Sequence, residues 1–244
     1  MNQLPPECVQ LHMYPGLGLY KWVLWGLQIF EYNGVSCPIE QRPEMVFLTD
    51  LTSHLACAVH VSSLALKDVV SSPEEMFGPA DGPTPYLRSR IGYHDHFYDL
   101  NTWHSWDSCV FLQVTSLFWQ TLLREEGDLS AMIGSNGFSF YVAPHRDTTE
   151  VLERLLSAPF PGETEWLTAV LDLYALVVAV GHDGQFFNVY ARDREAIHLI
   201  EPSLQTAIHA IETSKWFQTH QIELAWDDWH GCLLLPENNL PEPP

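Results

Sequence analysis

The sequence combines a large excess of acidic residues with enough apolar residues to build a packed core. Asp and Glu number 31 against 11 Lys and Arg, which gives a formal net charge of −20 over 244 residues. Only 17% of the residues are charged, whereas 46% are hydrophobic and nine are Trp. Disordered acidic chains lack this apolar mass, so we expect a folded protein.

The charge balance also restricts the partners that the protein can bind directly. Contacts with nucleic-acid phosphates and with anionic lipid headgroups both need a basic surface. We therefore expect neither nucleic acid nor a membrane as a direct partner. The acidic excess is uneven, with a net charge of −7 over residues 1–122 and −13 over residues 123–244. Such a surface favours solubility or attraction to a basic protein.

The sequence predicts a cytoplasmic location. The first eight residues contain neither the basic region nor the apolar region of a signal peptide. The longest apolar run, residues 169–180, is interrupted by Asp172 and is shorter than the roughly 20 residues that span a bilayer. The five cysteines are scattered and form no CxxC motif, which is typical of buried thiols in a reducing compartment.

The apolar patterns predict a mixture of helices and strands without regular alternation. Residues 19–32 fit either a strand pair or a buried helix, and residues 44–70 look helical in part. Further along, we expect strands at 108–118, 137–142 and 185–191, helices at 147–156 and 203–217, and a helix or a long strand at 166–180.

These elements predict an α+β fold in which a mixed, mainly antiparallel sheet packs with helices. We expect a single compact domain over residues 1–235. A subdomain boundary is possible near residues 71–90, where Ser, Pro and Gly are frequent. Residues 236–244 are rich in Pro and acidic, and we expect them to form a loose tail.

The densest polar cluster runs from Tyr93 to Asp107. In an extended segment His94 and His96 share a face, and with Asp99 or His104 they could bind a metal. This cluster supports a metal-dependent hydrolase as an alternative, but its spacing matches no metal motif, and a binding loop or a structural loop fits it as well.

The chain otherwise carries no catalytic signature. It contains no GxSxG nucleophile motif and neither of the Gly-rich phosphate-binding motifs. We therefore expect no catalytic residues, no bound metal and no cofactor, and we expect that the protein is not an enzyme. A non-catalytic adaptor within a larger assembly remains a further alternative.

Three acidic patches are candidates for binding a basic protein, and two of them interleave carboxylates with Trp. Aromatic side chains supply buried area at interfaces, while carboxylates pair with Arg or Lys of the partner. Solvated carboxylates beside core Trp residues would give the same pattern. The candidate residues are Asp95, Asp99, Trp103, Trp106 and Asp107; Glu125, Glu126 and Asp128; and Trp226, Asp227, Asp228 and Trp229.

The segments Leu19-Tyr20-Lys21-Trp22, Gly92-Tyr93-His94 and Trp226-Asp227-Asp228-Trp229, with the acidic balance, resemble bacterial immunity proteins of polymorphic toxin and type VI secretion systems. The resemblance is to the family paired with restriction-endonuclease-like nuclease toxins. It implies a cytoplasmic antitoxin whose partner is a cognate basic nuclease effector. Such a protein neutralises the toxin by occluding its active site or by blocking its active assembly, and performs no chemistry.

Overall fold

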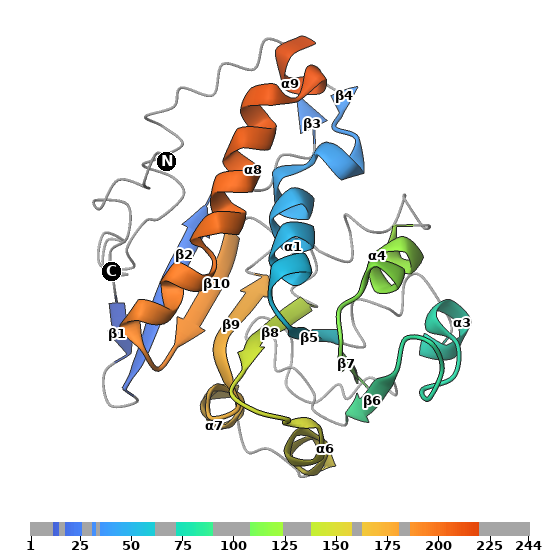
Figure 1. Ribbon diagram of the computed structural model, residues 1–244, viewed down its shortest axis with the longest axis vertical. Coiled ribbons are helices and arrows are strands. Elements are labelled where there is room, and N and C mark those ends of the chain that lie inside the picture. Colours follow the sequence, from blue (N-terminus) through green and yellow to red (C-terminus); the bar gives the residue numbers. More distant parts are fainter. Residues whose placement is uncertain are drawn as a thin grey trace, which may run out of the picture.

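The computed structural model describes residues 12–14, 18–25, 31–32, 35–61, 72–89, 108–123, 138–157, 163–180 and 186–219. Over these residues the fold is α+β, as the sequence predicts, and it is built on an eight-stranded sheet with the strand order β1-β2-β10-β9-β8-β5-β7-β6 (Figure 1). Every pairing between these strands is antiparallel, so the described sheet is not mixed.

The strands are short at the sheet edges and longer at its centre. In sheet order they are β1 (His12–Tyr14), β2 (Leu19–Trp25), β10 (Phe186–Ala191), β9 (Tyr174–Val180), β8 (Phe138–Pro144), β5 (Cys57–Val61), β7 (Ser108–Phe111) and β6 (Tyr86–Ser89). A separate two-stranded sheet pairs β3 (Glu31–Tyr32) with β4 (Val35–Ser36).

Helices surround this sheet. Those that precede β8 in the chain are η2 (Ile39–Gln41), α1 (Pro43–His54), α3 (Pro73–Phe77) and α4 (Ser116–Leu122). Those that follow it are α6 (Thr149–Ser157), α7 (Glu163–Leu171), η4 (Arg194–Leu199), α8 (Glu201–Thr213) and α9 (Lys215–Thr219). None of the helices in the described ranges is long and apolar enough to cross a membrane.

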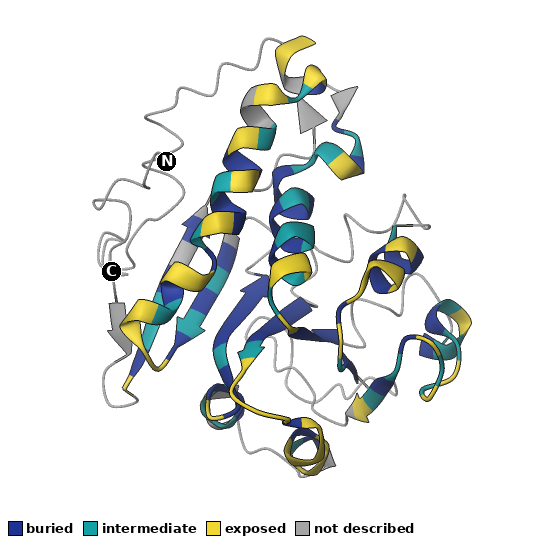
Figure 2. Ribbon diagram, viewed as in Figure 1, coloured by how far each residue is buried: buried dark blue, intermediate teal, exposed yellow. Residues whose placement is uncertain are grey.

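Both faces of the sheet are buried, and this explains the composition of its central strands. All five residues of β5 are buried, as are six of the seven residues of β9 (Figure 2). Because successive side chains of a strand point to opposite faces, such strands need apolar cover on both sides. One apolar cluster lies on each face of the sheet.

The larger cluster lies under α1 and α8, which run side by side across the sheet (Figure 1). The strands contribute alternate residues to it, such as Phe187, Val189 and Ala191 of β10. At the other end of this face, Trp119 of α4 donates a hydrogen bond from Nε1 to Oγ1 of Thr52 in α1, at 2.8 Å. This bond connects two helices that cover different parts of the same face.

The smaller cluster lies on the opposite face, under α6 and α7. Leu152 and Leu156 of α6 and Trp166 of α7 pack there against Tyr141 and Val177. The helix predicted at 147–156 is confirmed as α6, which begins at Thr149. Two residues before it, Asp147 accepts a hydrogen bond from the backbone N–H of Thr149.

Three of the predicted elements have different boundaries in the structure. The strand expected at 108–118 ends at Phe111, and α4 begins at Ser116 with Thr115 as its capping residue. Residues 166–180 are neither all helix nor all strand, since α7 ends at Leu171 and β9 begins at Tyr174. The helix expected at 203–217 is interrupted at Ser214, between α8 and α9.

Strands on both sides of residues 71–90 belong to the same sheet, in which β6 pairs with β7 and β5 pairs with β7 and β8. Residues 73–77 form α3, and Gly78 ends this helix with a φ of 79°, a conformation that glycine adopts readily. The acidic tail predicted at 236–244 lies outside the described residues.

Candidate functional site

All twelve residues of the predicted acidic patches lie outside the described residues, and so do His94, His96 and His104 of the alternative metal cluster. Their placement therefore remains a prediction. The described strands fix the positions of the residues that flank residues 90–107. Ser89 ends β6, Ser108 begins β7, and these two residues are paired directly opposite each other at one end of the sheet.

On the described surface, three ionisable side chains lie together where η4 meets α8. The two ring nitrogens of His198 lie between two carboxylates: Nδ1 is 2.8 Å from Oε1 of Glu201, and Nε2 is 3.1 Å from Oε2 of Glu195. The hydrogen bond to Glu201, with the charges of both carboxylates, raises the pKa of His198. Both contacts are satisfied together when the ring is protonated and donates from each nitrogen.

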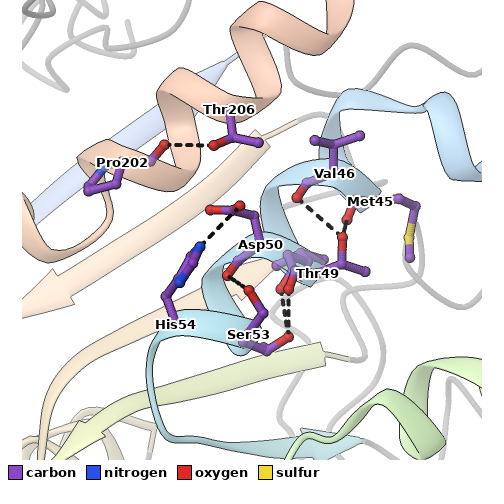
Figure 3. Close-up of polar contacts among 10 residues, drawn as sticks. Met45, Val46, Thr49, Asp50, Ser53, His54, Pro202 and Thr206 are labelled. Atoms are coloured by element: carbon purple, nitrogen blue, oxygen red, sulfur yellow. Dashed lines mark hydrogen bonds and ion pairs between the residues drawn. The ribbon is translucent and has the colours of Figure 1, made fainter. Parts of the chain in front are cut away.

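A second histidine–carboxylate pair lies on α1, beside α8 (Figure 3). Nε2 of His54 is 3.5 Å from Oδ1 of Asp50 one helical turn earlier. The hydroxyls around this pair bond to their own helix: Thr49 donates to the carbonyl of Met45 at 2.6 Å, and Ser53 donates to the carbonyl of Asp50 at 2.8 Å.

Several arginines of the described surface are neutralised by carboxylates of the same chain. Arg192 contacts Asp172 at 2.7 Å and also donates to the carbonyl of Thr168 at 3.1 Å. Arg88 pairs with Glu74, and Arg154 pairs with Glu150. Each of these pairs removes one charge of either sign, and carboxylates remain in excess over the whole chain.

His60 is a buried ionisable residue that the sequence analysis did not single out. It lies on β5, is 1% exposed, and is paired across the strands with Ser139 of β8 and Val110 of β7. Its ring stacks on Tyr141 at 6.5 Å between centroids and lies 6.4 Å from the ring of Trp166. The available sequence signal was its position within the apolar run Cys57–Val61.

Burial determines the protonation state of His60. Removal from water disfavours the charged ring and lowers the pKa of His60 to about 4. The residue is therefore neutral near pH 7. A fully buried ring of this kind has no access to a substrate, so its position indicates a structural role.

The described residues offer little for covalent or metal chemistry. Burial raises the pKa of Cys37 to about 11 and that of Cys57 to about 12, so neither thiol forms the nucleophilic thiolate near neutral pH. Within the described ranges, no group of three or more His, Cys, Asp or Glu side chains is placed to hold a metal ion. The arrangement on this part of the chain is suited to electrostatic contact with a cationic surface.

Comparisons of the chain with protein-family models, with curated proteins and with solved structures find no match.

Proposed function

We propose that the protein is an immunity protein that binds a cognate nuclease toxin, a type VI secretion effector, and neutralises it in the cytoplasm of the producing cell. The observation that carries the proposal is the net charge of −20 on a folded, aromatic-rich chain. The ion pairs of Arg88, Arg154 and Arg192 support it, because they neutralise three of the eleven basic residues within the chain itself.

The mechanism follows from the charges of the two proteins. A nuclease that acts on DNA needs a basic surface around its active site. An acidic protein is attracted to that surface over a long range and can occupy the site in place of the phosphates. Binding elsewhere could instead block the assembly of the active nuclease. Either route requires stoichiometric binding and no catalytic step, no cofactor and no direct contact with nucleic acid or membrane.

The direct test uses the purified protein and the C-terminal domain of the toxin encoded by the adjacent gene. We expect the two to elute as one complex in size-exclusion chromatography and DNA cleavage to stop at a one-to-one ratio. Separate elution with undiminished cleavage would contradict the proposal. Metal analysis of the same dialysed sample tests the alternative hydrolase, which requires a stoichiometric metal.

The salt dependence of association tests the electrostatic part of the mechanism. We expect the association rate constant to fall steeply between 10 mM and 150 mM NaCl, because salt screens attraction between exposed charges. The dissociation rate constant should change much less. Stopped-flow fluorescence measures both rates, and an association rate that is independent of salt would remove electrostatic attraction from the mechanism.

A further inference from the structure

A contact between His60 of β5 and Trp166 of α7 joins the sheet to one of its helices. The two ring centroids lie 6.4 Å apart. The ring of Tyr141 in β8 lies 6.5 Å from that of His60 and 6.1 Å from that of Trp166. All three residues are at most 5% exposed. The helix α7 therefore supplies part of the cover that keeps water away from the imidazole.

The strands on either side of His60 are held in place by backbone hydrogen bonds. β5 is paired with β7 over residues 59–61 and with β8 over residues 57–61. His60 lies directly opposite Val110 on one side and Ser139 on the other. Exposure of the imidazole by separation of either strand would break hydrogen bonds of the antiparallel ladder.

The helix α7 is held by contacts of a different kind. Trp166, Val170 and Leu171 pack into the smaller cluster. Near the end of the helix, Arg192 donates a hydrogen bond to the carbonyl of Thr168 at 3.1 Å. Movement of α7 away from the sheet would give up these contacts and leave the pairing of β5 with β7 and β8 intact. Among the described elements in contact with the imidazole, α7 can therefore leave without loss of sheet hydrogen bonds.

Protonation of His60 is unfavourable while α7 is in place. Removal from water is the largest influence on the imidazole, and it lowers the pKa of His60 to about 4 from an ordinary value of 6.5. The other titratable residues of the surrounding elements are Tyr141 of β8 and, in the first turn of α7, Glu163 and Glu165. The cysteines of β5 and β7 belong to the larger cluster on the opposite face.

We propose that the contact between His60 and Trp166 is an acid-sensitive switch, in which protonation of His60 is coupled to the release of α7 from the sheet. The packed form is fully stable above pH 6.5 and loses stability as the pH falls toward 4, because the released form binds the proton more tightly. From the two pKa values, the equilibrium constant for release should rise roughly thirtyfold between pH 7.5 and pH 5.0. This inference concerns the chain alone and does not depend on the proposed function.

Hydrogen–deuterium exchange of the wild-type protein at pH 7.5 and pH 5.0 tests the switch. The quantity compared is the protection factor, the intrinsic exchange rate at each pH divided by the observed rate, for amides of α7 (residues 163–171) and of β5 (residues 57–61). We expect α7 to be less protected than β5 at both pH values, because β5 stays paired when α7 is released. Protection of α7 should fall roughly thirtyfold at pH 5.0. Equal protection of α7 and β5, or no fall in α7, would overturn the proposal.

Three variants assign the pH response to one residue. His60→Gln removes the titrating group, so protection of α7 should then differ by less than about threefold between the two pH values. The matched control, His198→Gln, makes the same change at an exposed histidine and should retain the whole fall. The double variant Glu163→Gln with Glu165→Gln should retain it as well. A fall that persists in His60→Gln, or that disappears in the glutamate variant, would contradict the assignment to His60.

Urea separates the release of α7 from global unfolding without any variant. Release of one helix exposes less surface than unfolding of the chain, so its free energy should depend less steeply on urea. In exchange experiments at urea concentrations below the unfolding midpoint, we expect protection of β5 to fall more steeply than protection of α7. Identical slopes would show that α7 leaves the sheet only when the whole protein unfolds.

Discussion

His60 is held in a place where its charged form is unfavourable. The ring contacts those of Tyr141 and of Trp166 in α7, and burial lowers the pKa of His60 to about 4 from an ordinary value of 6.5. The unfolded chain therefore takes up a proton at this residue at a higher pH than the folded chain does. Acidification through this interval favours unfolding, because protons bind more tightly to the unfolded state.

From this shift we expect the contribution of His60 to the free energy of unfolding to fall as the pH decreases from 6.5 to 4. Above pH 6.5 this contribution should be constant. His60 alone should make the free energy of unfolding about 2 kcal/mol smaller at pH 5.0 than at pH 7.5. Urea unfolding at the two pH values measures the difference. The exposed His198 acts with the opposite sign, since its raised pKa contributes stability that is lost as the pH rises.

The variant His60→Gln separates this residue from the other titrating groups. Glutamine is neutral throughout the interval, so the difference between pH 5.0 and pH 7.5 should shrink by about 2 kcal/mol whatever the variant's own stability. His198→Gln serves as the control, and its free energy of unfolding should still decrease between pH 7.5 and pH 5.0. An unchanged pH dependence in His60→Gln would show that other groups cause the acid sensitivity.

At the scale of elements, the bond between Trp119 and Thr52 connects α4 to α1. Replacement of Thr52 by Val removes the acceptor, and Trp119, which is 6% exposed, then has a buried indole N–H to satisfy. We expect Thr52→Val to lower the free energy of unfolding by about 1–2 kcal/mol in urea experiments. Thr52→Ser keeps the hydroxyl and should retain most of the stability, and an equal loss in both variants would exclude the hydrogen bond as the cause.

Elements with a clear period or capping residue are predictable from the sequence. The alternation of Phe187, Val189 and Ala191 predicts β10, and all three residues are buried on one face. For residues 166–180 the sequence does not distinguish helix from strand, because β9 is apolar on both faces and shows no strand period. The change from α7 to β9 depends on the pairing of β9 with β8 and β10, and the sequence of residues 166–180 alone does not contain this information.

The candidate site is less predictable than the fold. Clustered carboxylates predict the three acidic patches, two of which also contain Trp, and none of the patches falls on the described residues. The packing of α1 against α8 has no such local signal, since the two helices are far apart in the sequence and meet only in the folded chain. His60 illustrates the same limit, because its burial depends on α7 and on three strands.

At the scale of the whole molecule, the net charge of −20 means that carboxylates repel one another in the folded state and lower its stability. Salt shortens the Debye length from about 30 Å at 10 mM to about 8 Å at 150 mM, which weakens this repulsion. We therefore expect the midpoint of urea unfolding to rise when NaCl increases from 10 mM to 150 mM. Choline chloride should have the same effect if screening is the cause. A lower midpoint at 150 mM would mean that ion pairs such as Arg192–Asp172 outweigh the repulsion.

The position of β2 beside β10 has a consequence for how the protein is made. Trp22 and Leu24 are buried in the larger core cluster, and their strand pairs with β10, which comes from the last third of the chain. During synthesis β2 leaves the ribosome on the order of ten seconds before β10 exists. Until then its apolar side chains are exposed in the nascent chain, because β2 has no partner strand β10. Pairing between such distant segments is also intrinsically slow. Chaperone binding at residues 19–25 would cover this interval.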